Sequence, residues 1–283
     1  MNAIQAVVLA VLQGATELFP VSSLGHAVVL PALLNWNIDQ RAAAFLPFLV
    51  MLHLGTATAL LLYFWRDWWA LLTGLLGVGD AHQVRESRRV TWLVVVATIP
   101  AVVVGFLLEH FFRRLFGDPV TAAAVLIVNG GLLLLGERLR GGQQGARRRP
   151  LSTLSVADAL AIGCWQCTAL VPGISRSGAT IVGGLLRGID HAGAAHFSFL
   201  IATPIIFGAT ALEVPKLRHA GMALAGDVAG LSVLAAVVAG LTAYASTAFL
   251  MRYFRGNDRW ALNPFAYYCF AAGAGSLAVL LAR

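Results

Sequence analysis

The chain has 283 residues and a net charge of +7, and 59% of its residues are hydrophobic while only 12% are charged. Soluble domains carry about 25% charged residues, so this chain lacks the polar side chains needed to cover a water-exposed surface. The composition excludes a cytosolic enzyme, a nucleic-acid-binding protein and a disordered chain, and it predicts an all-α polytopic membrane protein.

Six segments are apolar enough to form membrane-spanning helices, which need about 20 mostly apolar residues. In chain order they cover residues 45–64, 90–108, 118–136, 196–212, 228–250 and 260–282. Two further apolar stretches, residues 3–34 and 155–190, are each interrupted by a polar break. Each half of a broken stretch has only about 10–15 residues, too few to span a membrane. We therefore expect two re-entrant hairpins whose polar backbone lines a cavity inside the protein.

The two broken stretches resemble each other, and each precedes three of the predicted spans. Residues 16–20 align with residues 168–172, and both segments run from a threonine to a proline. An odd number of spans in each repeat gives the two repeats opposite orientations. The sequence therefore predicts one membrane domain, residues 1–283, built from two inverted-topology repeats, residues 1–140 and 151–283, each with one re-entrant hairpin and three transmembrane helices.

The basic residues predict the orientation in the membrane. Most of the 20 Lys and Arg residues lie in the segments 65–89, 137–157, 187–195 and 251–259, which we interpret as loops. Under the positive-inside rule these loops face the cytoplasm. The first hairpin then enters from the outside and the second from the cytoplasm, so that their tips meet near the middle of the membrane. The aromatic cluster at residues 63–69 is typical of a membrane interface.

The first break contains an isolated carboxylate, Glu17, in a stretch of apolar sequence. A carboxylate at membrane depth is costly and indicates a functional site, with a structural pair to an arginine as the alternative. Gln13 lies one helical turn earlier on the same face. Ser22 and Ser23 open the next helix, where Ser22 is well placed to be only a cap. His26 follows one turn later, so a carboxylate, a hydroxyl and an imidazole can converge as acid, base or nucleophile.

The second break places three hydroxyls, two glycines and one arginine at the start of a helix. Backbone N–H groups at a helix start bind anions, and an arginine fork binds phosphate through two hydrogen bonds. The alternative is a serine-capped helix whose arginine pairs with Glu17. The residues that we expect to bind phosphate are Ser175, Arg176, Ser177, Gly178 and Thr180.

The two breaks together predict a site for a phosphate or diphosphate group. Because the site lies at membrane depth, the carrier of that phosphate is expected to be a lipid. A divalent cation that bridges the diphosphate oxygens is plausible, with Glu17 and Gln13 as its protein ligands. His53, in the first predicted span, is expected to be a hydrogen-bonded structural histidine, with a proton relay as the alternative.

The segment Gln13–His26 resembles the first signature motif of the undecaprenyl-diphosphatase family, also called the bacitracin-resistance protein family, and Pro172–Thr180 resembles the second. The similarity runs nearly end to end. It implies a bacterial inner-membrane enzyme that hydrolyses undecaprenyl diphosphate to undecaprenyl phosphate and phosphate, and so recycles the carrier lipid for peptidoglycan synthesis. It also implies inverted repeats with two re-entrant hairpins and dependence on a divalent cation such as Mg²⁺ or Ca²⁺. The orientation predicted from the basic residues opens the site to the periplasmic side.

The resemblance assigns roles to the residues of both motifs. It implies that Glu17 is a carboxylate of the metal or phosphate site and that Ser23 and His26 are the candidate nucleophile and its acid–base partner, although either of these two is able to attack. The implied catalytic residues are Glu17, Ser23, His26 and Arg176, and the implied substrate-binding residues are Gln13, Ser22, Ser175, Ser177, Gly178 and Thr180. Two positions depart from the family pattern. Gln13 occupies a position where the family often has glutamate, and Cys269 occupies a position where it often has arginine.

A transporter or flippase of a polyprenyl phosphate is the alternative function, because inverted repeats with half-helices at the midplane also describe transporters. The set of Glu17, Ser23 and His26 favours a phosphatase, since a carrier needs no nucleophile. The sequence leaves the oligomeric state open, with a homodimer as one option.

Overall fold

The computed structural model describes the chain except for residues 37, 39–44, 109–116, 142–148 and 220–226. In this described part the secondary structure is helical, as the composition predicts. The elements are α1 (Ala3–Thr16), α2 (Ser23–Leu33), α3 (Phe45–Tyr63), α4 (Trp65–Leu75), α5 (Ala81–Leu107), α7 (Pro119–Gly141), the short 3-10 helix η1 (Leu151–Thr153), α8 (Val156–Thr168), α9 (Arg176–Leu186), α10 (His191–His219), α11 (Asp227–Gly256) and α12 (Asn263–Leu281).

Five of the described helices, α5, α7, α10, α11 and α12, are long and apolar enough to cross a membrane. A sixth candidate is α3 together with α4, which meet at a bend of 75°. These helices match the six predicted spans, so the prediction of a multi-pass membrane protein is confirmed. The two interrupted stretches form the short helix pairs α1–α2 and α8–α9, with the predicted breaks between them.

Several predicted loops are partly helical, because α7, α10 and α11 extend into the segments 137–157, 187–195 and 251–259, and the segment 65–89 departs most from the prediction. Residues 65–89 form α4 and the first turns of α5, although the sequence analysis treated this segment as a connection between spans. The helix α5 starts at Ala81 because the side chain of Asp80 accepts hydrogen bonds from the backbone N–H groups of His82 and Gln83. A search for long apolar runs misses such a segment, because α4 is apolar on one side only. In the predicted loop 137–157, residues 142–148 lie outside the described part of the chain.

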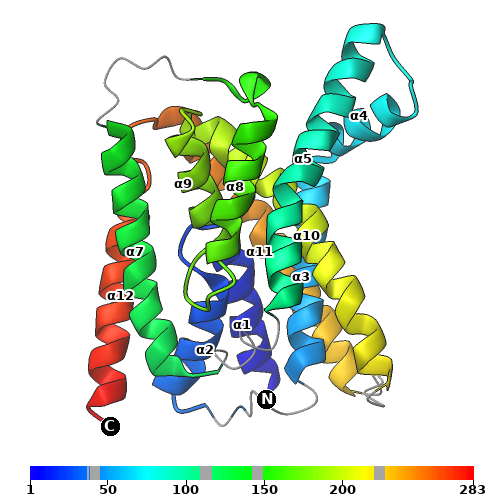
Figure 1. Ribbon diagram of the computed structural model, residues 1–283. Helices are drawn as coiled ribbons and strands as arrows, with labels where there is room; N and C mark the ends of the chain where they lie inside the picture. The colour runs from blue at the N-terminus through cyan, green and yellow to red at the C-terminus, as the bar shows by residue number, and fades with distance from the viewer. Residues whose placement is uncertain (37, 39–44, 109–116, 142–148, 220–226) are drawn as a thin grey trace.

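The long helices flank the two short pairs, and α8 lies between α7 and α5 in the view of Figure 1. At one side of the bundle α7 packs on α12, and at the other side α3 packs on α11. The short helix α1 packs on α11, and the short helix α8 packs on α5. Close packing explains why Gly14 is required in α1, since a Cβ at this position would lie 2.4 Å from the carbonyl oxygen of Ala239 in α11. The short helices α1 and α8 each keep an exposed face, whereas most residues of the two breaks are buried or half-buried.

A buried polar cluster ties α7, α10 and the connection between α11 and α12 together at the end of the bundle remote from the N-terminus. Nε2 of His191 lies 2.7 Å from Oε1 of Glu137, and Nδ1 lies 2.8 Å from Oδ1 of Asp258. Arg140 adds an ion pair to Asp258 at 2.7 Å. Burial raises the pKa of the Asp258 carboxyl, but hydrogen bonds from His191 and Arg140 outweigh it and hold the pKa below its ordinary value. The carboxylate of Asp258 is therefore charged at neutral pH.

Candidate active site

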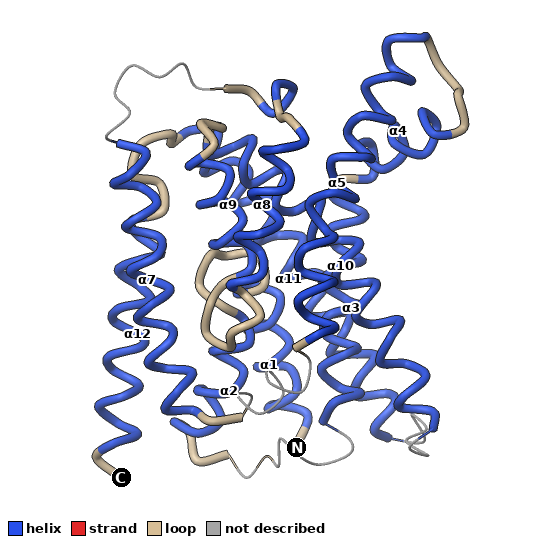
Figure 2. Tube along the Cα trace, in the orientation of Figure 1, coloured by secondary structure: helices blue, strands red, loops and turns tan. Residues whose placement is uncertain are grey.

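The two polar breaks lie against each other inside the bundle, where Figure 2 shows loop segments among the helices. The carbonyl oxygen of Phe19 in the first break accepts hydrogen bonds from the hydroxyls of Ser177, at 3.1 Å, and Ser175, at 3.4 Å, in the second. Gly173 has a φ of +104°, and a Cβ there would lie 2.7 Å from Cβ of Val125, so this turn needs glycine. The two breaks therefore form one site.

Glu17 is the centre of this site. Its Oε1 accepts a hydrogen bond from Nη2 of Arg176 at 3.0 Å, and its Oε2 accepts hydrogen bonds from Oγ of Ser23 at 2.6 Å and Nε2 of Gln13 at 3.1 Å. The carboxylate is buried, with only 8% of the residue exposed. A buried charge needs such partners, because desolvation of an unpaired carboxylate costs several kcal/mol. The structure thus joins three predicted site residues, Gln13, Ser23 and Arg176, to the carboxylate of a fourth, Glu17.

Arg176 uses only part of its guanidinium in this pair. Its Nη1 atom is buried, and among the described residues it has no hydrogen-bond partner. A buried donor without a partner costs about 1–3 kcal/mol. Such a donor beside a paired carboxylate is a ready position for an oxygen of an anionic ligand, and phosphate is the ligand that suits an arginine fork.

The hydroxyl of Ser23 lies against the carboxylate of Glu17. Its hydroxyl donates to Oε2 of Glu17 over 2.6 Å, which is within the range for proton transfer to a general base. Ser23 lies at the first position of α2 and is half-buried. A carboxylate that accepts this proton raises the nucleophilicity of the hydroxyl oxygen.

His26 does not join Ser23 and Glu17 in the way that the sequence analysis expected. Its Nδ1 donates to the carbonyl oxygen of Ser22 at 2.6 Å. Because a carbonyl only accepts, the neutral imidazole carries its proton on Nδ1, and Nε2 accepts from the hydroxyl of Tyr268 at 2.8 Å. The rings of His26 and Tyr268 also stack, with centroids 5.6 Å apart. The basic nitrogen of His26 therefore faces Tyr268.

The remaining predicted phosphate ligands are bonded within the protein. The hydroxyls of Ser22 and Ser175 cap α2 and α9 by accepting from the N–H groups of Gly25 and Gly178. Thr180 lies 2.6 Å from the hydroxyl of Ser198, and the side chain of Ser177 bonds to Phe19 as described above. All four hydroxyl residues are buried: Ser22, Ser175, Ser177 and Thr180. The hydrogen bonds of these four hydroxyls hold the backbone of the two breaks in place around the Glu17–Arg176 pair.

Asn129 in α7 is a site residue that the sequence analysis missed. Its Nδ2 donates to the carbonyl oxygen of Pro20 at 3.0 Å, and its Oδ1 accepts from the N–H of Ser175 at 2.9 Å. Nδ2 also lies 3.3 Å from Sγ of Cys269, which is fully buried. One amide thus bridges both breaks. A single asparagine in an otherwise apolar span is a signal that would have pointed to it.

His53 and Tyr268 also reach the site. Nδ1 of His53 donates to the carbonyl oxygen of Leu49 at 2.8 Å, which fits the expected structural role. Its Nε2, however, lies 4.0 Å from Oε2 of Glu17. Tyr268, which holds His26, had no sequence signal of its own, because the two residues are 242 positions apart.

The protein by itself offers few ligands for a metal ion. In the described part of the chain, no group of three His, Cys, Asp or Glu side chains is arranged to hold one. Glu17 supplies one carboxylate, and the Gln13 amide that donates to it keeps a carbonyl oxygen for another contact. This donor set fits a hard divalent cation only when oxygen atoms of a substrate complete its coordination.

Comparison with known proteins gives matches over nearly the whole chain. The family model of the bacitracin resistance protein BacA matches residues 6–275, which include both polar breaks. The chain is 66% identical over 289 residues to an undecaprenyl-diphosphatase of Granulibacter bethesdensis, covering 99% of this chain and 97% of that one. It is 58% identical over 280 residues to the undecaprenyl-diphosphatase of Acidiphilium cryptum, with 99% of both chains covered. Undecaprenyl-diphosphatase 2 of Chromobacterium violaceum is 50% identical, with 98% of both chains covered.

Proposed function

The chain belongs to the bacitracin resistance protein BacA family, and we propose that it is an undecaprenyl-diphosphatase whose active site is formed by the two polar breaks. It hydrolyses the phosphoanhydride of undecaprenyl diphosphate and so returns the carrier lipid to cell-wall synthesis. The observation that carries the assignment of the site is the contact of 2.6 Å between Oγ of Ser23 and Oε2 of Glu17, next to an arginine with an unused buried donor.

The geometry supports a sequence of steps. Oγ of Ser23 attacks the terminal phosphorus while its proton passes to Glu17, and the bond from this phosphorus to the bridging oxygen breaks. Undecaprenyl phosphate leaves, and Nη1 of Arg176 binds a terminal oxygen as charge develops. Water then splits the phosphoserine, so that inorganic phosphate departs and the hydroxyl of Ser23 regains a proton. We favour Ser23 over His26 as the nucleophile because Nε2 of His26 is bonded to Tyr268.

A divalent cation, Mg²⁺ or Ca²⁺, is part of this proposal. Glu17 and the amide oxygen of Gln13 would hold it together with oxygens of the diphosphate. When bound, the cation neutralises negative charge on the phosphate oxygens and makes the terminal phosphorus a better electrophile. Arg176 would keep its second terminal nitrogen, Nη1, for an oxygen of the substrate.

We also propose that the bundle consists of two inverted repeats, each with a re-entrant hairpin. The proposed correspondence is of α1, α2, α3, α5 and α7 with α8, α9, α10, α11 and α12. Under this correspondence, the contact of α1 with α11 is equivalent to the contact of α8 with α5. The contact of α3 with α11 is likewise equivalent to the contact of α10 with α5. Similarly, α2 packs on α12 as α9 packs on α7. This exchange of partners supports a two-fold relation between the halves.

The proposed orientation places the segment 251–259 in the cytoplasm and opens the site to the periplasm. It rests on the distribution of the basic residues. A reporter fused after Gly256 is expected to report a cytoplasmic location, and one fused after Arg283 an external location. The opposite pattern would overturn the orientation and leave the hydrolysis unaffected.

The activity is tested with purified protein and undecaprenyl diphosphate in detergent. We expect release of one phosphate for each undecaprenyl phosphate formed, and a strong loss of rate with a chelator that is restored by added Mg²⁺ or Ca²⁺. The rival function, a carrier of polyprenyl phosphate, predicts binding without any release of phosphate.

A further inference from the structure

Far from the candidate active site, α4 and the first turns of α5 form a helical hairpin, residues 65–89, that leans outward from the bundle (Figure 1). Its two helices are packed closely, since a Cβ at Gly74 of α4 would lie 2.2 Å from Cβ of Ser87 in α5. Nε of Arg88 also donates to the carbonyl oxygen of Gly74 at 3.2 Å. The hairpin is therefore a fixed structural element with an outer surface of its own.

One side of α4 carries an exposed apolar stripe. Trp65, Trp69, Leu72 and Leu76 follow each other at spacings of three and four residues, so they lie on one face. Their exposed fractions are 56%, 62%, 53% and 79%. The preceding helix α3 ends at Tyr63, and the chain then turns by 75°. Because α3, with 19 residues, is by itself about long enough to span a membrane, we place the start of α4 near the membrane surface, where tryptophan is favoured.

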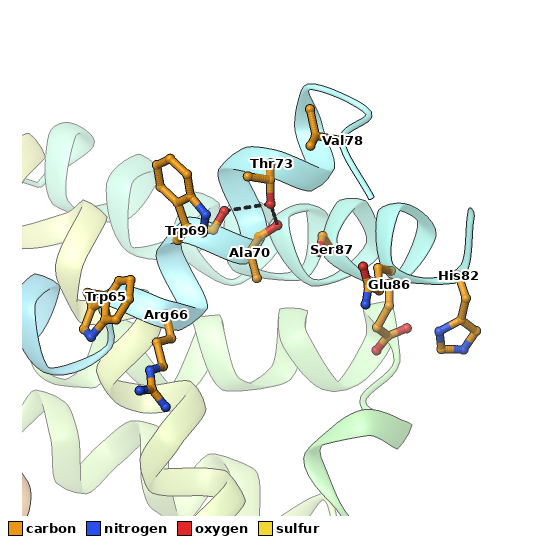
Figure 3. A pocket seen from close by; sticks show the side chains of 10 residues that line it. Trp65, Arg66, Trp69, Ala70, Thr73, Val78, His82, Glu86 and Ser87 are labelled. Carbon is orange, nitrogen blue, oxygen red and sulfur yellow. Dashed lines mark hydrogen bonds between the residues drawn. The ribbon is translucent and has the colours of Figure 1, made fainter. Parts of the chain in front are cut away.

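A pocket of about 620 Å³ opens between α4 and α5 at the edge of this stripe (Figure 3). Trp65 and Trp69 form its aromatic wall, and Arg66, His82 and Glu86 supply its charged or titratable side chains. The pocket lies outside the Glu17–Arg176 site and shares no residue with it.

The charges of the pocket favour an anion. Glu86 is already paired with Nη1 of Arg89 at 2.6 Å. Arg66 lies over the ring of Trp65, 5.6 Å from its centroid. Among the described residues no hydrogen bond or ion pair engages its guanidinium. Within the described part of the chain, the pocket thus presents one cation without a polar partner, Arg66, beside an apolar face.

We propose that this pocket binds the phosphate headgroup of an anionic phospholipid, whose acyl chains follow the apolar stripe of α4. Arg66 binds the phosphate oxygens, Trp65 and Trp69 cover the glycerol region, and Leu72 and Leu76 contact the acyl chains. This combination of an arginine and tryptophans at the end of a span is what a headgroup at a bilayer surface requires. The hairpin is then a lipid-binding anchor beside the enzyme.

The test is native mass spectrometry of the delipidated full chain in detergent, with phosphatidylglycerol or phosphatidylcholine added at equal concentration. We expect the wild type to retain phosphatidylglycerol in preference to phosphatidylcholine. Arg66→Gln is expected to weaken the retention of phosphatidylglycerol about fivefold, as one basic residue near an anionic surface contributes. Trp69→Ala should weaken the retention of both phosphatidylglycerol and phosphatidylcholine.

Matched variants control for charge and for aromatic area. Arg255→Gln, at an exposed position in the last turn of α11, removes the same charge, and Trp92→Ala removes an exposed tryptophan of α5. Both should retain phosphatidylglycerol like the wild type, and Arg66→Gln should keep the phosphatase rate. Equal retention by Arg66→Gln and the wild type would overturn the proposal. The proposal would also be overturned if inorganic phosphate displaced the lipid, or if the wild type formed a dimer that Trp69→Ala dissociates.

Discussion

Nη2 of Arg176 lies 3.0 Å from Oε1 of Glu17, although 159 positions separate the two residues. This ion pair joins the second polar break to the first, and it leaves Nη1 of Arg176 buried without a partner among the described residues. The pair therefore links the architecture to the proposed chemistry, because the guanidinium that holds the breaks together also carries the donor that we propose binds the phosphate.

Loss of the Arg176 side chain is expected to lower kcat by about 10²–10³, the usual effect of removing one preorganised donor from a transition state. Arg176→Lys keeps the charge without the fork and should also be impaired. The measurement is phosphate release by purified Arg176→Ala and Arg176→Lys, with Arg252→Lys, at an exposed position of α11, as the control. If Arg176→Lys reaches the wild-type rate, the fork geometry plays no part in the reaction.

Gln13→Glu is expected to keep activity and to make it depend more steeply on the divalent cation. The amide of Gln13 lies 3.1 Å from Oε2 of Glu17, so the substitution brings two carboxylates together. Their repulsion is relieved when a cation binds between them. Phosphate release should be measured across a cation titration, and a folded Gln13→Glu protein without turnover at any cation concentration would contradict this interpretation.

Asn129→Ala should lower kcat by more than tenfold with little change in KM, because it releases the link between the two breaks but removes no group that touches the substrate. Asn129→Asp should recover part of the rate, since its carboxylate still accepts from the N–H of Ser175. Steady-state kinetics of both variants provide the check. Thr247→Val serves as the control, because the buried hydroxyl of Thr247 bonds only within its own helix. A loss of kcat with Thr247→Val as large as with Asn129→Ala would mean a general packing effect.

Glu137→Ala should destabilise the protein without changing the rate per folded molecule. Oε1 of Glu137 accepts from His191 and from the N–H of Leu262, both at 2.7 Å. The substitution leaves two buried donors without this acceptor, which costs about 1–3 kcal/mol each. The thermal unfolding midpoint in detergent measures the loss, and Glu86→Ala, in a more exposed ion pair, should barely change it. An unchanged midpoint for Glu137→Ala would show that the cluster adds no stability.

The sequence predicted the parts of this protein that have a strong local signal. Long apolar runs are sufficient to locate the six spans, and polar residues inside apolar stretches are sufficient to locate both breaks. The contacts between the breaks were only partly predictable. A pair of Glu17 and Arg176 can be expected from the sequence, because the two residues carry opposite charges at membrane depth. The hydrogen bonds of Ser175 and Ser177 to Phe19 depend on how two distant segments are placed, and no local pattern encodes that.

Two features of the structure, the helix α4 and the contact of Tyr268 with His26, could not be predicted from the sequence, for different physical reasons. The helix α4 has apolar residues on one face only, so a search for continuous apolar runs passes over it. Tyr268 is one of several aromatic residues in an apolar helix, and its contact with His26 follows from the packing of α12 near α2.

The most direct test of the account measures phosphate release and lipid binding together, with purified Ser23→Ala and His26→Ala and undecaprenyl diphosphate. Neither residue supplies the main charge that binds the diphosphate, so both variants should bind the lipid nearly as well as the wild type. Ser23→Ala should release no phosphate, because the hydroxyl that donates to Glu17 at 2.6 Å is gone. His26→Ala should release phosphate more slowly than the wild type, because it removes the hydrogen bond from Nδ1 to the carbonyl oxygen of Ser22, next to the nucleophile. Release of phosphate by both variants at the wild-type rate would contradict the assignment of this site as the phosphatase centre.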